Sequence, residues 1–109
     1  MGLVQTTSAA TFDVQYLQFI NESSDITQPL PTFATDETLL YFYRQMALTR
    51  AYDIKSTNLQ RTGRLGGYAS CRGQEAVGVA IGHALRKEDV LSPHYRDQAA
   101  QFIRGNSLG

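Results

Sequence analysis

The feature that most constrains this chain is an unbroken stretch from Asp36 to Thr62 that contains neither glycine nor proline. Thr35 precedes it and can serve as an N-cap, because its hydroxyl can accept a hydrogen bond from a free N–H of the first turn. Asp36 and Glu37 fall in that turn, where the helix dipole favours acidic side chains. Gly63 follows as a left-handed stop. The pattern predicts one long helix over 36–62.

Apolar side chains recur at helical spacing on two adjacent faces of this helix. The first face consists of Leu40, Tyr43, Ala47, Ala51 and Ile54, and the second of Leu39, Phe42 and Met46. So broad an apolar sector is more than one short partner helix would cover. We interpret these side chains as core, and we assign no cofactor role to Tyr43 or to the nearby Tyr52.

The residues before the helix divide into two parts. Residues 1–11 are small and polar, and we expect a disordered tail. From Phe12 onward apolar and polar residues alternate, which indicates a short strand, and residues 26–27 can pair back on it as a β-hairpin. Two prolines then mark a stiff linker. The expected domains are therefore the tail, a hairpin arm with its linker at 12–34, and a helical part at 35–109.

A second helix is predicted to open at Glu75 and to run to about Leu85. Small residues alternate with Val77, Val79 and Ile81 along it, and glycines four apart allow another helix to approach closely. Glycine inside a helix costs about 1 kcal/mol relative to alanine, so packing must compensate. We interpret this as a buried helix of a core larger than this chain supplies. His83 has no second ligand at metal-binding spacing, and we interpret it as structural.

A last helix is predicted to begin at His94–Asp97, directly after a short extended piece that ends at Pro93. Helix N-termini attract anions, because their free N–H groups and dipole point outward. Arg96 adds a permanent charge whose planar fork matches phosphate oxygens. The turn therefore suits a phosphate group. The alternative is a surface ion pair of Arg96 with Asp97 or Glu88, which would contribute little stability.

Overall charge and composition narrow the class of protein. The chain has 10 Lys and Arg against 10 Asp and Glu, which gives no reason to expect nucleic acid or an anionic membrane as partner. Cys71 is the single cysteine, so no internal disulfide can form. No secretory signal and no long apolar span are apparent in the sequence. We expect a soluble cytoplasmic protein.

Four segments carry a family resemblance through their order and spacing. They are Arg-Thr-Gly-Arg-Leu-Gly-Gly-Tyr-Ala at 61–69, Gly-Gln-Glu-Ala at 73–76, Lys-Glu-Asp-Val-Leu at 87–91 and Tyr-Arg-Asp at 95–97. Together with the small-residue helix, they resemble the alpha subunit of the thiamine-diphosphate-dependent 2-oxo acid dehydrogenases, and most of all the bacterial pyruvate dehydrogenase type. The resemblance covers about residues 12–109. No single segment is specific, but the ordered set is.

The resemblance implies an α/β thiamine-diphosphate-binding fold for the family, of which this part is mainly α-helical with the short N-terminal β-hairpin. It implies that Tyr95 and Arg96 bind the cofactor's diphosphate, with His94 beside them and Tyr68 on the substrate side. For Gln74 and Glu75 we prefer a capping and packing role. No catalytic residue is expected in this stretch.

The implied activity is that of the decarboxylating component of the pyruvate dehydrogenase complex. Pyruvate loses carbon dioxide, and an acetyl group passes to the lipoyl carrier of an acyltransferase component. The alternatives are a branched-chain 2-oxo acid or acetoin dehydrogenase and, from another class, a non-catalytic helical interaction module.

One departure from the family bears on the metal. The family's Gly-Asp-Gly motif, which holds magnesium and diphosphate, has no counterpart in this sequence. The magnesium ligands are therefore expected outside it, and a glutamate that activates the cofactor is expected from the beta subunit of a heterotetramer. We expect an N-terminal fragment that is inactive alone.

Overall fold

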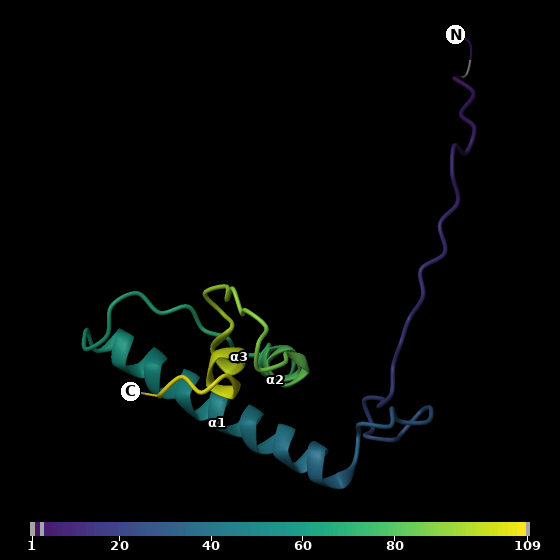
Figure 1. The fold of residues 1–109 in the computed structure, drawn as a ribbon. Coiled ribbons are helices and arrows are strands. Elements are labelled where there is room, and N and C mark those ends of the chain that lie inside the picture. Colours follow the sequence, from purple (N-terminus) through teal and green to yellow (C-terminus); the bar gives the residue numbers. More distant parts are fainter. Residues whose placement is uncertain (1, 3, 109) are drawn as a thin grey trace. The chain divides into compact units, whose positions relative to one another are not determined.

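The computed structural model describes residue 2 and residues 4–108. They contain three α-helices, α1 at Asp36–Arg61, α2 at Glu75–Ala84 and α3 at Gln98–Ile103. The chain divides into two compact units between Thr32 and Phe33, and the three helices belong to the second. Within that unit α2 and α3 lie on the same side of α1 (Figure 1). No described helix is long and apolar enough to cross a membrane.

The first unit contains a turn but, over its described residues, no strand. A single antiparallel bridge joins Ile20 and Ile26, and the Asn21 side-chain oxygen accepts hydrogen bonds from the N–H groups of Ser23 and Asp25 at 3.0 and 2.9 Å. The predicted β-hairpin is therefore wrong. Apolar side chains of the expected strand are 82–91% exposed at positions 12, 14 and 16. A two-stranded ribbon is marginal without a surface to cover it, and this unit offers none.

The expectation of a disordered tail at 1–11 stays a prediction, and positions 1 and 3 lie outside the described residues. The described residues of this segment are exposed and have no regular secondary structure.

Local capping sets both ends of α1. The Thr35 hydroxyl accepts a hydrogen bond from the Thr38 N–H at 3.3 Å. At the other end Thr62 is the C-cap, and Gly63 adopts the left-handed conformation with φ of +71°. The long helix is confirmed, because capping depends on neighbours in sequence that can be read directly.

The fully buried residues of α1 are polar, which corrects part of the predicted core, although Phe42 and Met46 of its second face are half-buried. Thr49, Asp53 and Ser56 are the buried residues of this helix. Tyr43 of the expected core is 65% exposed, and Leu40 is 48% exposed. The physical reason at Asp53 is that the loop after α1 packs there, and its N–H and O–H groups donate to the carboxylate.

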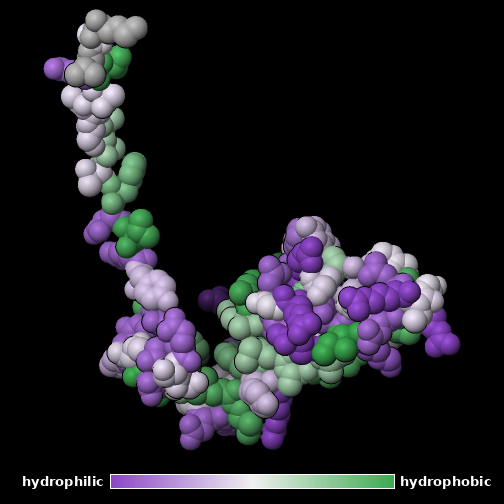
Figure 2. Space-filling model, turned by 180° about the vertical axis from the view of Figure 1, so that it is seen from behind, coloured by the Kyte–Doolittle hydropathy of each residue, from purple (hydrophilic) through white to green (hydrophobic). Residues whose placement is uncertain are grey.

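Close packing joins α2 to α3. A Cβ built on Gly78 would lie 2.8 Å from the Ala99 Cβ, and one on Gly82 would lie 2.7 Å from the Ile103 Cβ. The predicted close approach is therefore confirmed. The opposite face of α2 is open, however, with Val77 59% exposed. Hydrophobic side chains accordingly reach the surface of the three-helix unit in several places (Figure 2).

The last helix starts later than predicted. Residues 94–97 form a turn in which the Asp97 carboxylate accepts a hydrogen bond from the His94 N–H at 2.6 Å, and α3 begins only at Gln98. Asp97 closes this turn with its side chain, a bond that competes with helical continuation.

Candidate functional site

Arg96 lies half-buried in the turn before α3. One guanidinium nitrogen, Nη1, donates a hydrogen bond to the backbone carbonyl of Ser70, and Cζ lies 5.2 Å from the centre of the Tyr95 ring. Within the described part of the chain Arg96 forms no ion pair. Asp97, one of its two predicted surface partners, instead accepts from His94. The guanidinium is thus held in place while its charge has no carboxylate partner among these residues.

The aromatic neighbours of Arg96 form a small surface group. Tyr95 is 63% exposed, and its ring centre lies 3.6 Å from that of His94. The structure therefore brings together His94, Tyr95 and Arg96. It does not support the helix dipole as an additional source of positive charge, because α3 starts two residues after Arg96 and has only six residues. Any charge offered to an anion at this turn comes from the Arg96 side chain.

Tyr68 points into a different set of contacts, centred on Asp53 of α1. The Asp53 side chain accepts three hydrogen bonds of 2.8 Å, from the Tyr68 hydroxyl and the Cys71 N–H on Oδ1 and from the Ser70 hydroxyl on Oδ2. Asp53 is only 2% exposed. Sequence reasoning missed this residue. The available signal was the polar series Thr49, Asp53 and Ser56, spaced by four and three residues along one face of a helix.

The electrostatics of this cluster follow from burial and hydrogen bonding. Burial acts to raise the pKa of Asp53, but the hydrogen bonds from Cys71, Ser70 and Tyr68 outweigh it, and the pKa lies below its ordinary value. Burial and the hydrogen bond to Asp53 raise the pKa of the Tyr68 hydroxyl. Burial, followed by the charge of Asp53, raises the pKa of the Cys71 thiol to about 11. Asp53 is therefore an anion surrounded by neutral donors.

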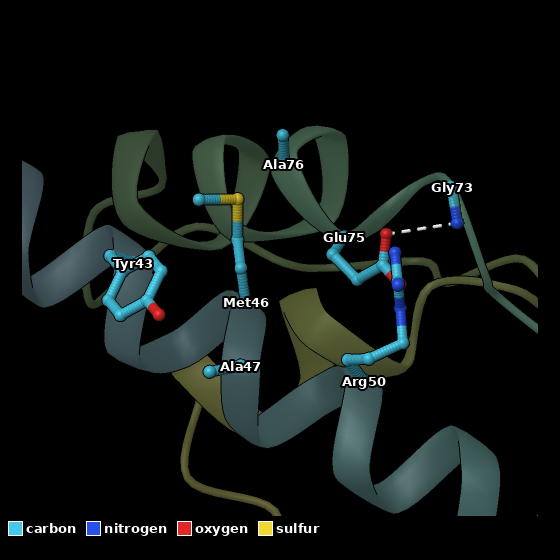
Figure 3. A pocket seen from close by; sticks show the side chains of 7 residues that line it. All are labelled: Tyr43, Met46, Ala47, Arg50, Gly73, Glu75 and Ala76. Atoms are coloured by element: carbon cyan, nitrogen blue, oxygen red, sulfur yellow. Dashed lines mark hydrogen bonds and ion pairs between the residues drawn. The ribbon is translucent and has the colours of Figure 1, made fainter.

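Arg50, one turn before Asp53, holds the other end of the same loop. Its Nε donates to Oε1 of Glu75, and Oε2 of Glu75 accepts from the Gly73 N–H at 2.9 Å (Figure 3). The hydrogen bond from Arg50 lowers the pKa of Glu75, against the opposing effect of burial. The predicted capping and packing role is met by Glu75, whereas Gln74 makes no side-chain cap bond. Tyr43, Met46, Ala47 and Ala76, which Figure 3 also labels, line the same cleft as this pair.

No metal site is formed by the described residues. They contain no group of three or more His, Cys, Asp or Glu side chains that could hold an ion. His83 packs edge-on against Phe42, with ring centres 4.8 Å apart, and lies near Tyr41. Its environment is that of a structural aromatic side chain.

Comparison with known proteins places this chain in a family. Residues 43–109 match the model of the family described as dehydrogenase E1 component, and these residues are more than half of the chain. The chain therefore belongs to the dehydrogenase E1 component family. Its described helices, the Asp53 cluster and the His94–Arg96 turn all lie within or across this match.

The curated relatives are alpha subunits of such enzymes. The chain is 43% identical over 106 residues to the pyruvate dehydrogenase E1 component subunit alpha of Bacillus subtilis, which covers 84% of this chain and 28% of the relative. It is 46% identical over 70 residues to the 3-methyl-2-oxobutanoate dehydrogenase subunit alpha of Mycobacterium tuberculosis. This match covers 64% of this chain and 19% of the relative. A Staphylococcus aureus pyruvate dehydrogenase E1 component subunit alpha is 40% identical over 84 residues. This match covers 76% of this chain and 23% of the relative.

These matches confirm the resemblance seen in the sequence motifs. The chain spans between 19% and 28% of the length of these relatives. No solved structure matches the chain.

Proposed function

We propose that this chain is the N-terminal part of the alpha subunit of a thiamine-diphosphate-dependent 2-oxo acid dehydrogenase, and that Arg96 binds the diphosphate of the cofactor. The observation that carries the proposal is that the Arg96 guanidinium is held in place without an acidic partner among the described residues. The Ser70 carbonyl and the Tyr95 ring orient this guanidinium. A fixed cation with unused donors is suited to an anion with several oxygens.

The neighbouring side chains suit the same ligand. The exposed Tyr95 can donate its hydroxyl to a phosphate oxygen, and His94 stacks beside it at the edge of the turn. The bound cofactor supplies the electron sink for decarboxylation, and the protein supplies position and charge. We propose that magnesium is held by parts of the enzyme other than this chain, since the described residues offer no ligand cluster.

Tyr68 remains a prediction as a residue on the substrate side. Its hydroxyl already donates its proton in a hydrogen bond to Asp53 at 2.8 Å, and its ring is half-buried. In this arrangement the hydroxyl cannot also donate to the carboxylate or ketone oxygen of a 2-oxo acid.

Pyruvate is the substrate that we propose first, and 3-methyl-2-oxobutanoate is the alternative, because relatives of both names match at similar identity. The proposed partners are the beta subunit and the lipoyl-bearing acyltransferase component of the same complex. The proposed location is the cytoplasm, by analogy with the bacterial relatives.

The test uses a chimeric enzyme, in which this sequence replaces the aligned segment of the Bacillus subtilis alpha subunit and is assembled with the beta subunit. Thiamine diphosphate is titrated at fixed magnesium and salt. Arg96→Ala removes a charge-assisted hydrogen bond of about 1.5–3 kcal/mol, so the Kd of the cofactor should rise roughly tenfold or more. The melting temperature of the cofactor-free enzyme should change little.

Arg72→Ala is the matched control, because it removes the same charge from an exposed position on the neighbouring loop. It should leave the Kd nearly unchanged. Equal cofactor affinities of the wild type and Arg96→Ala would overturn the proposal. Turnover of pyruvate and of 3-methyl-2-oxobutanoate by the same chimera decides between the two substrates.

A further inference from the structure

We propose that Asp53 is a positioning residue for Arg96, and that it acts through Ser70. The inference rests on the cofactor role of Arg96 proposed above. Asp53 itself lies inside the protein and contacts no ligand, so its effect on the cofactor would be transmitted through the loop that it holds.

Ser70 is the link between the two charged side chains. Its hydroxyl donates to Oδ2 of Asp53 at 2.8 Å, and its backbone carbonyl accepts the hydrogen bond from Nη1 of Arg96. Asp53 also binds the residues on both sides within the same short segment, through the Tyr68 hydroxyl and the Cys71 N–H. The carbonyl that orients Arg96 is thus fixed in a segment anchored to α1 at three points.

A second contact ties the same segment to the turn. Nε2 of Gln98 donates to the Ala69 carbonyl at 2.9 Å and to the Tyr95 carbonyl at 3.1 Å. The loop and the turn therefore share two bridges, one from Arg96 and one from Gln98. Displacement of the loop would shift the guanidinium and the Tyr95 backbone together.

The benefit to binding is preorganisation. An arginine side chain has many rotamers, and a ligand that must select one of them loses affinity through the entropy of ordering. Hydrogen bonds to an ionised acceptor are stronger than those between neutral groups, so a buried carboxylate is an effective anchor for the loop. The alternative is that Asp53 only stabilises the fold. The two roles differ in whether the effect of Asp53 on cofactor binding depends on Arg96.

A double-mutant cycle in the chimeric enzyme measures this dependence. Ser70→Ala removes the hydroxyl that Asp53 holds but keeps the carbonyl that Arg96 contacts. We expect it to raise the Kd of thiamine diphosphate roughly threefold to tenfold. In the Arg96→Ala background we expect no further rise. Asp53→Asn, which preserves side-chain volume, is carried through the same cycle in case Ser70→Ala disturbs folding.

Arg50→Met is the control variant. It loosens the Gly73 end of the same loop through Glu75, and it has no bond to Ser70 or Arg96. Its effect on the Kd should be small and equal in both backgrounds. The melting temperature of each cofactor-free variant is recorded beside its Kd.

Each outcome of the cycle distinguishes a positioning role of Asp53 from a purely structural one. A rise in Kd that is present with Arg96 and absent without it supports the positioning role. An equal rise in both backgrounds, or no rise in either, overturns it and leaves the role of Arg96 intact. If Arg96→Ala alone leaves the Kd unchanged, the proposed function fails, and the positioning role fails with it.

Discussion

Asp53 is ionised although it is buried, because three donors converge on its two oxygens and outweigh the cost of removing the charge from water. Sequence reasoning placed the core of α1 on its apolar faces and assigned no role to Asp53. Hydrophobic pattern indicates which residues seek burial, but it carries no information about which polar residue will receive donors from a loop 15 to 18 positions later. The turn at Tyr95 and Arg96 was proposed as a site because its residues belong to a recognisable ordered set, and this assignment stays a prediction.

The depressed pKa of Asp53 predicts a pH dependence of loop stability. Its folded-state pKa lies below the ordinary value of 3.8, so its stabilising contribution is complete above that value and is lost as the pH falls through the folded pKa. Protection of the Cys71 N–H from hydrogen exchange, corrected for intrinsic rate, should stay constant from about pH 7 to about pH 5 and fall below about pH 4.

Mass spectrometry of the peptide around Cys71 in the chimeric enzyme measures this protection. In Asp53→Asn the protection should be lower throughout, and the fall in acid should disappear. A steep loss of protection in the wild type between about pH 7 and pH 5 would contradict the assignment of Asp53 as the titrating group.

At the scale of elements, the predictions succeeded at the ends of α1 and at the contact between α2 and α3, and they failed at the start of α3 and at the hairpin. The ends of α1 follow from Thr35 and Gly63, which act on the backbone beside them. The start of α3 was placed four residues too early, because a turn closed by Asp97 looks like a first helical turn in sequence. The hairpin failed because alternation predicts a strand only where a neighbouring surface exists to bury one face.

The contact between α2 and α3 predicts that Gly82 tolerates no side chain. A Cβ there would lie 2.7 Å from the Ile103 Cβ and 3.1 Å from the Ala100 Cα, and neither atom is the end of a flexible side chain. Gly82→Ala gains about 1 kcal/mol of helix propensity but forces overpacking that costs about 1–3 kcal/mol. We expect net destabilisation, seen as a lower melting temperature of the cofactor-free chimeric enzyme.

Gly66→Ala makes the same chemical change where no atom lies within 4 Å of the built Cβ. It should leave the melting temperature unchanged or raise it slightly, since alanine restricts the unfolded chain. Equal melting temperatures for Gly82→Ala and wild type would show that α3 can move away without loss.

At the scale of the whole molecule, the second unit leaves apolar faces of two helices open. Leu40, Tyr43 and Ile54 of α1 and Val77 and Ile81 of α2 are between 40% and 65% exposed. Patches of this kind mark surfaces that another protein surface covers. The relatives are several times longer than this chain. Under the proposed function, the cover would come from the remainder of the alpha subunit and from its partners.

This exposure predicts that the 109-residue chain self-associates when it is produced alone. Sedimentation velocity over a range of concentrations should show species larger than the monomer. Replacement of Val77 and Ile81 by glutamine should shift the distribution toward the monomer, because these apolar side chains are 59% and 40% exposed. Replacement of Phe12 and Val14, which lie in the other unit, is the matched control. A monomer that melts sharply and independently of concentration would contradict the prediction.

The burial of Asp53 and the exposure of Leu40 and Tyr43 on the same helix also bear on how the sequence can change over generations. Whether a substitution at Asp53 is tolerated depends on its hydrogen-bond donors, Tyr68, Ser70 and Cys71. These donors lie close to Asp53 in the same gene. Whether a substitution at the exposed Leu40 or Tyr43 is tolerated depends on the protein surface that covers it. That surface can belong to a different gene product. The two faces of this single helix are therefore expected to accumulate substitutions at different rates, each set by the residues that it contacts.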